Sequence, residues 1–328
     1  MDFHLTEDQE ALQQGIRAFC EGRVPTEQLA ELERKGGFDR GLWGELAEMG
    51  VFSLRLPESE GGVGLGSAEA VLVFAELGRR LVPGPLAWSQ LAAGLVEGAG
   101  AGGVVVGGLD LRSGGGAPLL VEHLAHLDAL LVLRDDGVAR LDPRALRAEA
   151  VATPLDPLTP VHHVASLPAG ERIAGPEDAA RLAREGATLA AAQLLGIAEA
   201  SQELATAYAK EREQFGRPVG GFQAVKHLLA DAFVRQELAR AAVYAAGATL
   251  DDPGAGDPAR AAAAAKLIAG EAALKNARTC IQVHGGMGYT WEVPAHYYFK
   301  RTWVLENAFG THTHHAERIA TSLDSATD

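Results

Sequence analysis

Residues 175–223 read GPEDAARLAREGATLAAAQLLGIAEASQELATAYAKEREQFGRPVGGFQ, and this stretch decides the fold. Its apolar residues recur every three or four places, which predicts a long helix with one buried face. Pro176 and the acidic residues after it are typical of a helix start, because proline fits the first turn and the helix dipole favours anions there. Gly216 and Pro218 predict the end of the helix. The predicted buried stripe consists of Leu194, Ile197, Ser201, Leu204 and Tyr208.

Three further helices are predicted after this one. The second runs from about 222 to 250 and stops at the sequence DDPGAG. The third begins with Asp257 as N-cap and Pro258 behind it, and it ends at the paired glycines Gly285 and Gly286. The fourth spans 312–323. Antiparallel helices with short connections form a bundle, and the many alanines allow close helix approach within one chain or between subunits.

The remainder of the chain divides into a helical and a β part. Thr6 with Gln9 three places later predicts a capping box, and helical spacing continues to about residue 100. Short apolar runs bounded by Gly, Pro and Asp then predict strands, and Asp136-Gly137 predicts a hairpin. We therefore expect a mainly α protein with a middle β domain. The predicted divisions are an N-terminal helical domain at 1–101, a β domain at 102–175 and a four-helix bundle at 176–328.

Composition excludes several classes of function. The 328 residues include 29 Lys and Arg against 43 Asp and Glu, and the net charge of −14 argues against nucleic acids and anionic membranes as partners. Cys20 and Cys280 form no CxxC pattern, so we expect neither a disulfide framework nor a zinc ribbon. The acidic start and the lack of a long apolar run predict a soluble, cytoplasmic protein.

Two clusters at predicted helix ends could hold a ligand. They read KEREQFGRPVGGFQ at 210–223 and QVHGGMGYTWEVP at 282–294. Arg212 could grip a phosphate with its planar guanidinium group, and Gly285 and Gly286 could let backbone amides approach a pyrophosphate closely. The alternative is a pair of ordinary helix C-caps. Neither cluster has the spacing of a Rossmann turn or of a P-loop.

Metal binding and serine-nucleophile catalysis are not predicted. The histidines at 312, 314 and 315, and Cys280 with His284, contain metal-ligating side chains, but no second ligand cluster lies nearby in the sequence. A solvated or capping role is the favoured interpretation, and we expect no metal. The sequence also lacks a G-x-S-x-G elbow.

At the level of motifs the chain resembles the acyl-CoA dehydrogenases, flavoproteins that desaturate acyl-CoA thioesters at the α and β carbons. The resemblance covers nearly the whole chain. Its motifs are LTEDQEAL at 5–12, PESEGGVGLGS at 57–67, REQFGRPVGGFQ at 212–223, QVHGGMGYTWEVP at 282–294 and AFGTHTHH at 308–315. The resemblance implies the same order of helical, β and bundle domains. It also implies contacts to the FAD of a neighbouring subunit from Arg212, Phe215, Gln282, Gly285 and Gly286.

The resemblance fails at the catalytic base. The family chemistry needs a carboxylate that removes the α-proton. The family's commonest location is a Tyr-Glu-Gly-Thr turn before the last helix, where this chain has Ala-Phe-Gly-Thr with Phe309 in place of the glutamate. The other location lies on the first bundle helix, and counting back from Arg212 leads to Gly186. Glu185 is one residue away, which turns it by about 100° around the helix. Glu185 and Glu306 remain the alternative bases.

The β domain is also shorter than the family's. We find no counterpart between 102 and 162 of the strands that usually hold the flavin ring. Both losses concern the chain's own half of the flavin site, whereas the neighbour-facing motifs are intact. This pattern resembles the base-less subunit of the α2β2 acyl-CoA dehydrogenases of actinobacterial sterol catabolism, which implies a partner with the catalytic glutamate and a steroid side-chain CoA ester as substrate.

Two other functions stay open from the sequence. One is a self-sufficient homo-oligomeric dehydrogenase that uses Glu185 or Glu306 as its base. The other is a flavin-free structural or regulatory paralogue that binds a dehydrogenase without contacting its cofactor.

Overall fold

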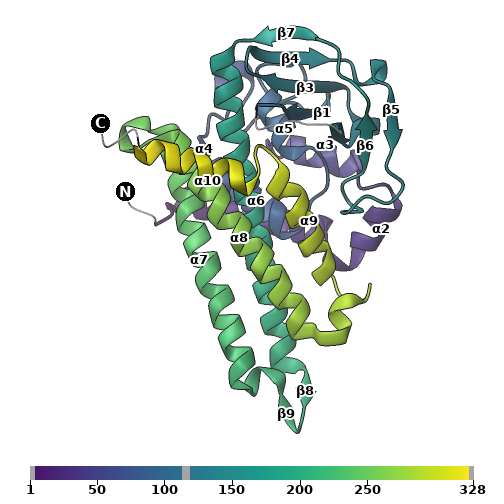
Figure 1. The fold of residues 1–328 in the computed structure, drawn as a ribbon, viewed down its shortest axis with the longest axis vertical. Helices are drawn as coiled ribbons and strands as arrows, with labels where there is room; N and C mark the ends of the chain where they lie inside the picture. Colours follow the sequence, from purple (N-terminus) through teal and green to yellow (C-terminus); the bar gives the residue numbers. More distant parts are fainter. Residues whose placement is uncertain (1–3, 113–118, 325–328) are drawn as a thin grey trace.

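The computed structural model describes residues 4–112 and 119–324. They form an N-terminal helical region, a small β region and a set of long C-terminal helices (Figure 1), which confirms the predicted fold class. The predicted capping box is present, because the Thr6 hydroxyl accepts from the Gln9 amide at 3.2 Å and the Gln9 side chain accepts from the Thr6 amide at 3.1 Å. The N-terminal helices are α1 (Glu7–Arg23), α2 (Leu29–Arg34), α3 (Arg40–Glu48), α4 (Ser67–Arg79) and α5 (Leu86–Ala92).

The middle region consists of two small sheets. One has the order β1-β3-β4-β7 and the other the order β2-β6-β5. The predicted hairpin joins β3 and β4, although its two-residue loop is Asp135 and Asp136, one place earlier than expected. Gly137 instead opens β4 with a φ of 142°. The strands are β1 (Val106–Asp110), β2 (Leu119–Glu122), β3 (Ala129–Arg134), β4 (Gly137–Leu141), β5 (Ala148–Ala150), β6 (Val161–Val164) and β7 (Glu171–Ala174).

The C-terminal region contains α6 (Pro176–Glu211), α7 (Gln223–Asp251), α8 (Pro258–His284), α9 (Ala295–Asn307) and α10 (His312–Asp324). The start of α6 at Pro176 and the N-cap of α8 at Asp257 are as predicted. Helix α6 ends at Glu211, before the expected glycine, because the next residues form the short hairpin β8 (Glu213–Gln214) and β9 (Arg217–Pro218). Helix α9 was not predicted, since its sequence AHYYFKRTWVLEN is rich in aromatic residues that also favour strands.

Small residues let α6 lie close to α4. A Cβ on Gly196 of α6 would come within 1.8 Å of the Ala75 carbonyl oxygen in α4. A Cβ on Gly78 of α4 would come within 2.2 Å of the Gln193 carbonyl oxygen. These contacts bury the middle of α6 between the N-terminal helices and the bundle. Across the described residues, every helix is too short or too polar to cross a bilayer.

Candidate functional site

The turn between α9 and α10 brings two distant parts of the sequence together. Phe309 adopts a φ of 55° and is 6% exposed. Its ring lies 4.5 Å from the ring of Trp88 at the start of α5. A Cβ on Gly186 of α6 would come within 2.3 Å of the same phenylalanine ring, so the ring lies directly on the glycine. The two positions that the sequence resemblance implies for the base, 186 and 309, are therefore in contact, and neither carries a carboxylate.

A buried lysine fixes this turn. The Lys266 ammonium group on α8 donates to the carbonyl oxygens of Glu306, Ala308 and Gly310 at 3.0, 2.8 and 3.1 Å. Burial lowers the pKa of Lys266 to about 7. The His315 Nε2 atom lies 3.1 Å from the Phe309 carbonyl oxygen. The backbone of the turn is thus held from two sides, which stabilises the left-handed conformation of Phe309.

The two alternative carboxylates are placed elsewhere. Glu185 pairs with Arg55 at 2.6 Å and with Arg181 at 3.3 Å, while its neighbour on the helix faces Phe309. This is the direction expected from a one-residue offset on a helix. The backbone carbonyl of Glu306 accepts from Lys266, and its carboxylate has an Oε2 atom that is buried without a hydrogen-bond partner among the described residues. Neither glutamate is among the residues that line the cavity beside Phe309.

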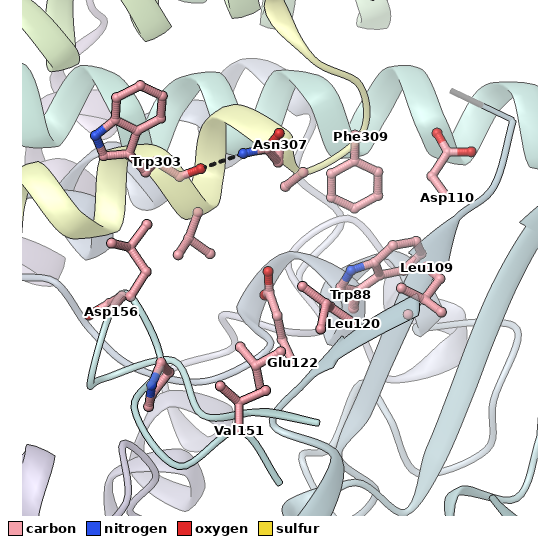
Figure 2. Close-up of a pocket in the computed structure, with 16 residues that line it drawn as sticks. Trp88, Leu109, Asp110, Leu120, Glu122, Val151, Asp156, Trp303, Asn307 and Phe309 are labelled. Atoms are coloured by element: carbon pink, nitrogen blue, oxygen red, sulfur yellow. Dashed lines mark hydrogen bonds between the residues drawn. The ribbon is translucent and has the colours of Figure 1, made fainter. Parts of the chain in front are cut away.

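That cavity has a volume of about 380 Å³ and lies between β1, β2, the segment 151–156 and α9 (Figure 2). Most of its wall is apolar, with Trp88, Trp303 and Phe309 contributing aromatic rings. The side chain of Glu122, the last residue of β2, extends into the space between them. Burial raises the pKa of Glu122 to about 7, and Asp156 adds to this effect while Arg301 opposes it.

No local pattern in the sequence indicates Glu122 or Trp88 as site residues. The available signal is a carboxylate at the end of the apolar run PLLVEH, on a strand in which Val121 is buried and Leu120 is exposed. A single glutamate in such a run does not indicate whether it faces solvent or a cavity. The position of Trp88 opposite this strand depends on tertiary packing that no local pattern shows.

The five residues expected to contact FAD lie together at the opposite end of the long helices. Arg212 and Phe215 follow the end of α6, and Gln282, Gly285 and Gly286 are at the end of α8. All five are exposed. The ring of Tyr208 on α6 lies 4.2 Å from that of His284 on α8 and joins the two helix ends. We call the exposed set Arg212, Phe215, Gln282, Gly285 and Gly286 the helix-end surface.

The geometry of the helix-end surface suits a pyrophosphate. Gly285 has a φ of 60°, and apart from adjacent residues nothing within 4–112 and 119–324 lies within 4 Å of a Cβ built on Gly285 or Gly286. Backbone amides can therefore be approached closely by a ligand. The guanidinium group of Arg212 makes no hydrogen bond or ion pair with another described residue, so its donors are available to an anion.

Cys280 and two of the imidazole groups considered in the sequence, those of His284 and His315, have local partners. Cys280 is buried, and the His284 Nδ1 atom lies 2.7 Å from the Cys280 carbonyl oxygen. His315 contacts the Phe309 carbonyl, while His314 lies at the first turn of α10. Within residues 4–112 and 119–324, no three His, Cys, Asp or Glu side chains converge as a metal site.

Comparisons with known proteins place this geometry in a family. Residues 6–100 match the family model for the acyl-CoA dehydrogenase N-terminal domain, and residues 176–323 match that for the acyl-CoA dehydrogenase C-terminal domain. Acyl-CoA dehydrogenase IpdE2 of Mycolicibacterium smegmatis is 32% identical over 312 residues, which cover 90% of this chain and 93% of that protein.

Two similar solved structures are complexes by their descriptions. The ChsE4-ChsE5 complex from Mycobacterium tuberculosis contains a chain with a TM-score of 0.86 and 28% identity, and the match covers 99% of both chains. A variant of the Tcur3481-Tcur3483 steroid ACAD has a TM-score of 0.86 and 25% identity, with 98% of this chain and 99% of that chain covered.

Proposed function

Because the chain belongs to the acyl-CoA dehydrogenase family, a family of oxidoreductases, we propose that it is the non-catalytic, FAD-contacting subunit of a heteromeric acyl-CoA dehydrogenase. In this proposal a second dehydrogenase-like subunit carries the catalytic glutamate, and the two assemble as α2β2. The reaction is α,β-desaturation of an acyl-CoA thioester, with a steroid side-chain CoA ester as substrate. The likeness to ChsE4-ChsE5 supports a two-chain assembly, and the likeness to a steroid ACAD supports the substrate class.

The contact between Phe309 and Gly186 carries the proposal. Removal of an α-proton needs a base within hydrogen-bond reach of that proton. The family places the base at one of two positions, and here both are apolar and pressed against each other. The nearest alternative on α6 is Glu185, whose carboxylate forms ion pairs with Arg55 and Arg181. The chain therefore depends on another subunit for the base.

The helix-end surface supports a role toward the cofactor of the partner. Bound FAD supplies the acceptor for the hydride that leaves the β-carbon. On this chain, Arg212 would pair with the pyrophosphate, and the backbone at Gly285 and Gly286 would approach it closely. Phe215 and Gln282 would contact the adenosine part. All these groups are exposed at one end of the molecule, where a second subunit can reach them.

Helix α7 offers a surface for that second subunit. Phe233, Val234 and Leu238 are each more than half exposed on this helix, which lies along one side of the molecule (Figure 1). Neighbouring exposed apolar side chains of this size are typical of a protein interface. Burial of this helix face against a partner helix would complete a bundle shared between subunits.

The first experiment compares visible absorption spectra of the chain purified alone and co-purified with a second dehydrogenase-like chain, such as one from a neighbouring gene. We expect a colourless chain alone and a yellow complex with about one FAD per pair. A yellow, active chain on its own would overturn the proposal. Loss of that activity in Glu185→Gln or Glu306→Gln would then identify the base.

The second experiment measures how tightly the complex holds FAD when Arg212→Ala is introduced. Loss of a charge-assisted hydrogen bond should weaken FAD binding by about 1.5–3 kcal/mol, which is roughly 10- to 150-fold. Arg260→Ala is the matched control, because Arg260 is an exposed arginine at the opposite end of α8. Equal FAD retention in both variants would favour a flavin-free structural paralogue.

A third variant tests the missing base directly. Phe309→Glu restores a carboxylate in the turn but leaves the shortened β region unchanged. We expect no turnover from this variant alone. Measurable activity would show that the chain retains a flavin-ring site of its own.

A further inference from the structure

A second cavity lies where the N-terminal helices meet the start of α6. Its volume is about 240 Å³, and its wall comes from the segment 52–56, from α5 with the residues that follow it, and from the first turns of α6. It shares no lining residue with the cavity beside Phe309 or with the helix-end surface. Sites for drug-sized ligands usually have roughly 300–1,000 Å³, so this cavity suits a smaller compound. The apolar part of its wall consists of Phe52, Leu56, Leu91 and Leu95.

The charged residues of this wall are both arginines. Among the described residues, Arg55 and Arg181 line the cavity and no aspartate or glutamate does. The buried Glu185 carboxylate pairs with both of them, at 2.6 and 3.3 Å, and Asp178 also pairs with Arg181, at 3.1 Å. The Asp178 side chain is 43% exposed, so water screens its charge. An anion in the cavity would therefore meet two guanidinium groups and no carboxylate, and the charges of the wall favour an anionic ligand.

Three polar atoms of the lining residues are buried without a hydrogen-bond partner in the described part of the chain. Two of them belong to Gln90 on α5, which is 3% exposed and leaves both its Nε2 donor and its Oε1 acceptor unsatisfied. The third is the Nε donor of Arg55, whose Nη atoms donate to the Ser67 hydroxyl at 3.1 Å and to Glu185 at 2.6 Å. Buried polar atoms are normally hydrogen-bonded, because leaving one unsatisfied costs free energy. A ligand that accepts two hydrogen bonds and donates one would satisfy all three atoms.

We propose that this cavity binds a short 2-hydroxycarboxylate with an apolar tail. Its carboxylate would accept from Arg55 Nε and Gln90 Nε2, and the hydrogen bond from the arginine is charge-assisted. Its hydroxyl group would donate to Gln90 Oε1, and its tail would pack against Phe52 and Leu91. An analogue without the hydroxyl group leaves Oε1 unsatisfied, and a neutral analogue loses the charge-assisted hydrogen bond. The site does not depend on FAD, on a CoA ester or on a partner subunit.

The test titrates the chain purified alone with three compounds of one carbon skeleton. They are 2-hydroxy-4-methylpentanoate, 4-methylpentanoate, which lacks the hydroxyl group, and 2-hydroxy-4-methylpentanamide, which lacks the charge. Isothermal titration calorimetry gives the dissociation constants and the stoichiometry. We expect the hydroxy acid to bind at one site per chain and at least tenfold more tightly than either analogue. Equal affinity for either analogue, or no saturable binding of the hydroxy acid, would overturn the proposal. Displacement of the hydroxy acid by FAD or coenzyme A would also overturn it, since the compound would then occupy a cofactor or substrate site.

Two variants locate the binding. Gln90→Leu removes both amide atoms at nearly the same side-chain volume and should weaken binding of the hydroxy acid at least tenfold. Gln236→Leu is the matched control, because Gln236 on α7 is 5% exposed, has an unpartnered Oε1 atom and does not line the cavity. The control should change the affinity less than twofold. Ala93→Phe fills the cavity from a partly exposed position and should abolish binding.

Thermal unfolding of the free variants separates a lost site from a lost fold. Gln90→Leu should raise the midpoint of unfolding, because it removes two buried polar atoms that have no partner. A lower midpoint would show that the fold itself satisfies the amide and would overturn the proposal. If Ala93→Phe does not fold, Gln90→Leu alone decides. Unchanged affinity for the hydroxy acid in the folded variants would show that it binds elsewhere, which would also overturn the proposal.

Discussion

The buried centre around Phe309 and the helix-end surface use similar residue types in opposite ways. At the centre, Arg301 is buried and paired with Asp156, and Phe309 is packed against Gly186. At the helix ends, Arg212 and Phe215 are exposed, and Phe215 is 92% exposed. The chain thus buries an arginine and a phenylalanine in one place and leaves the same two residue types exposed in the other.

The buried centre therefore contributes to the stability of the chain, whereas the helix-end surface is available for assembly. A buried, paired charge or a buried ring is needed for folding, because its loss leaves an unpaired charge or a cavity. An exposed arginine and phenylalanine contribute little to folding and are available to a partner or ligand. Substitutions at the buried centre should therefore lower the stability of the chain alone. Substitutions at the helix-end surface should leave that stability unchanged and weaken only cofactor or partner binding in the complex.

The largest effect is expected from Arg301→Ala. This change leaves the buried Asp156 carboxylate without its guanidinium partner and should lower the free energy of unfolding by about 3–5 kcal/mol. Urea unfolding of the chain alone is the measurement. Arg212→Ala, which removes an exposed arginine, is the control and should stay within about 0.5 kcal/mol of the wild type. Similar losses in both variants would remove the distinction between the two regions.

A smaller effect is expected where α6 meets the turn. Gly186→Ala adds a Cβ against the Phe309 ring and should cost about 1–3 kcal/mol by overpacking. Phe309→Val should relieve that clash, so the double variant should be more stable than the sum of the two single losses predicts by about 1 kcal/mol or more. A double-mutant cycle in urea measures this coupling.

Gly270→Ala on α8 is the matched control for this cycle. Among the residues that the structure describes, a Cβ on Gly270 has no neighbour within 4 Å outside its own helix, so alanine should stabilise the chain by about 0.5–1 kcal/mol. Additive losses in the cycle would mean that residues 186 and 309 are not in contact.

Glu122 should make stability depend on pH. Its pKa is raised to about 7 in the folded chain, so its contribution to stability is fully present below the unfolded pKa near 4.5 and is lost as the pH rises through 7. Glu122→Gln removes this titration. The stability of the variant relative to the wild type should therefore increase between pH 5 and pH 8, by roughly 1–3 kcal/mol.

The difference between the two unfolding profiles isolates Glu122 from other groups. Burial lowers the pKa of Lys266 to about 7 and of His123 to about 3, and these groups titrate in both proteins. Arg301 and Asp156 also remain in both. Profiles that stay parallel from pH 5 to pH 8 would show that Glu122 is not in a dry cavity.

Local patterns predict much of the fold, because the long helices have strong hydrophobic periodicity and recognisable capping residues. Thr6 and Asp257 cap helices as predicted, and Pro176 begins α6. Helix α9 was missed, since its stabilisation comes from buried contacts of Tyr297 and Tyr298 and not from helix propensity. Propensity is a weak signal where tertiary packing decides.

Local sequence patterns predict only part of the site. Counting along one helix predicts position 186 as a candidate for the base, and a short motif predicts position 309. Their contact depends on the packing of α6 against the α9–α10 turn, which neither pattern shows. Glu122 carried no distinguishing pattern, because the cavity it enters is built from β1, β2 and α9 together. Single-sequence patterns give the residues of one element and not the spaces between elements.

The smallest effect on the chain alone is expected at Phe215. This residue has a φ of 53°, a left-handed conformation that strains a non-glycine backbone, and its ring is almost fully exposed. Phe215→Gly relieves the strain but loosens the unfolded chain, and the two effects should cancel to within about 0.5 kcal/mol. In the complex the same change should weaken FAD retention at least tenfold, since the proposed role of Phe215 is to contact the adenosine part of the partner's FAD. The rate of FAD release from the complex, with Phe215→Tyr as the conservative control, measures this. Unchanged FAD retention in Phe215→Gly would mean that the exposed ring does not contact the cofactor, and the helix-end surface would lose its aromatic part.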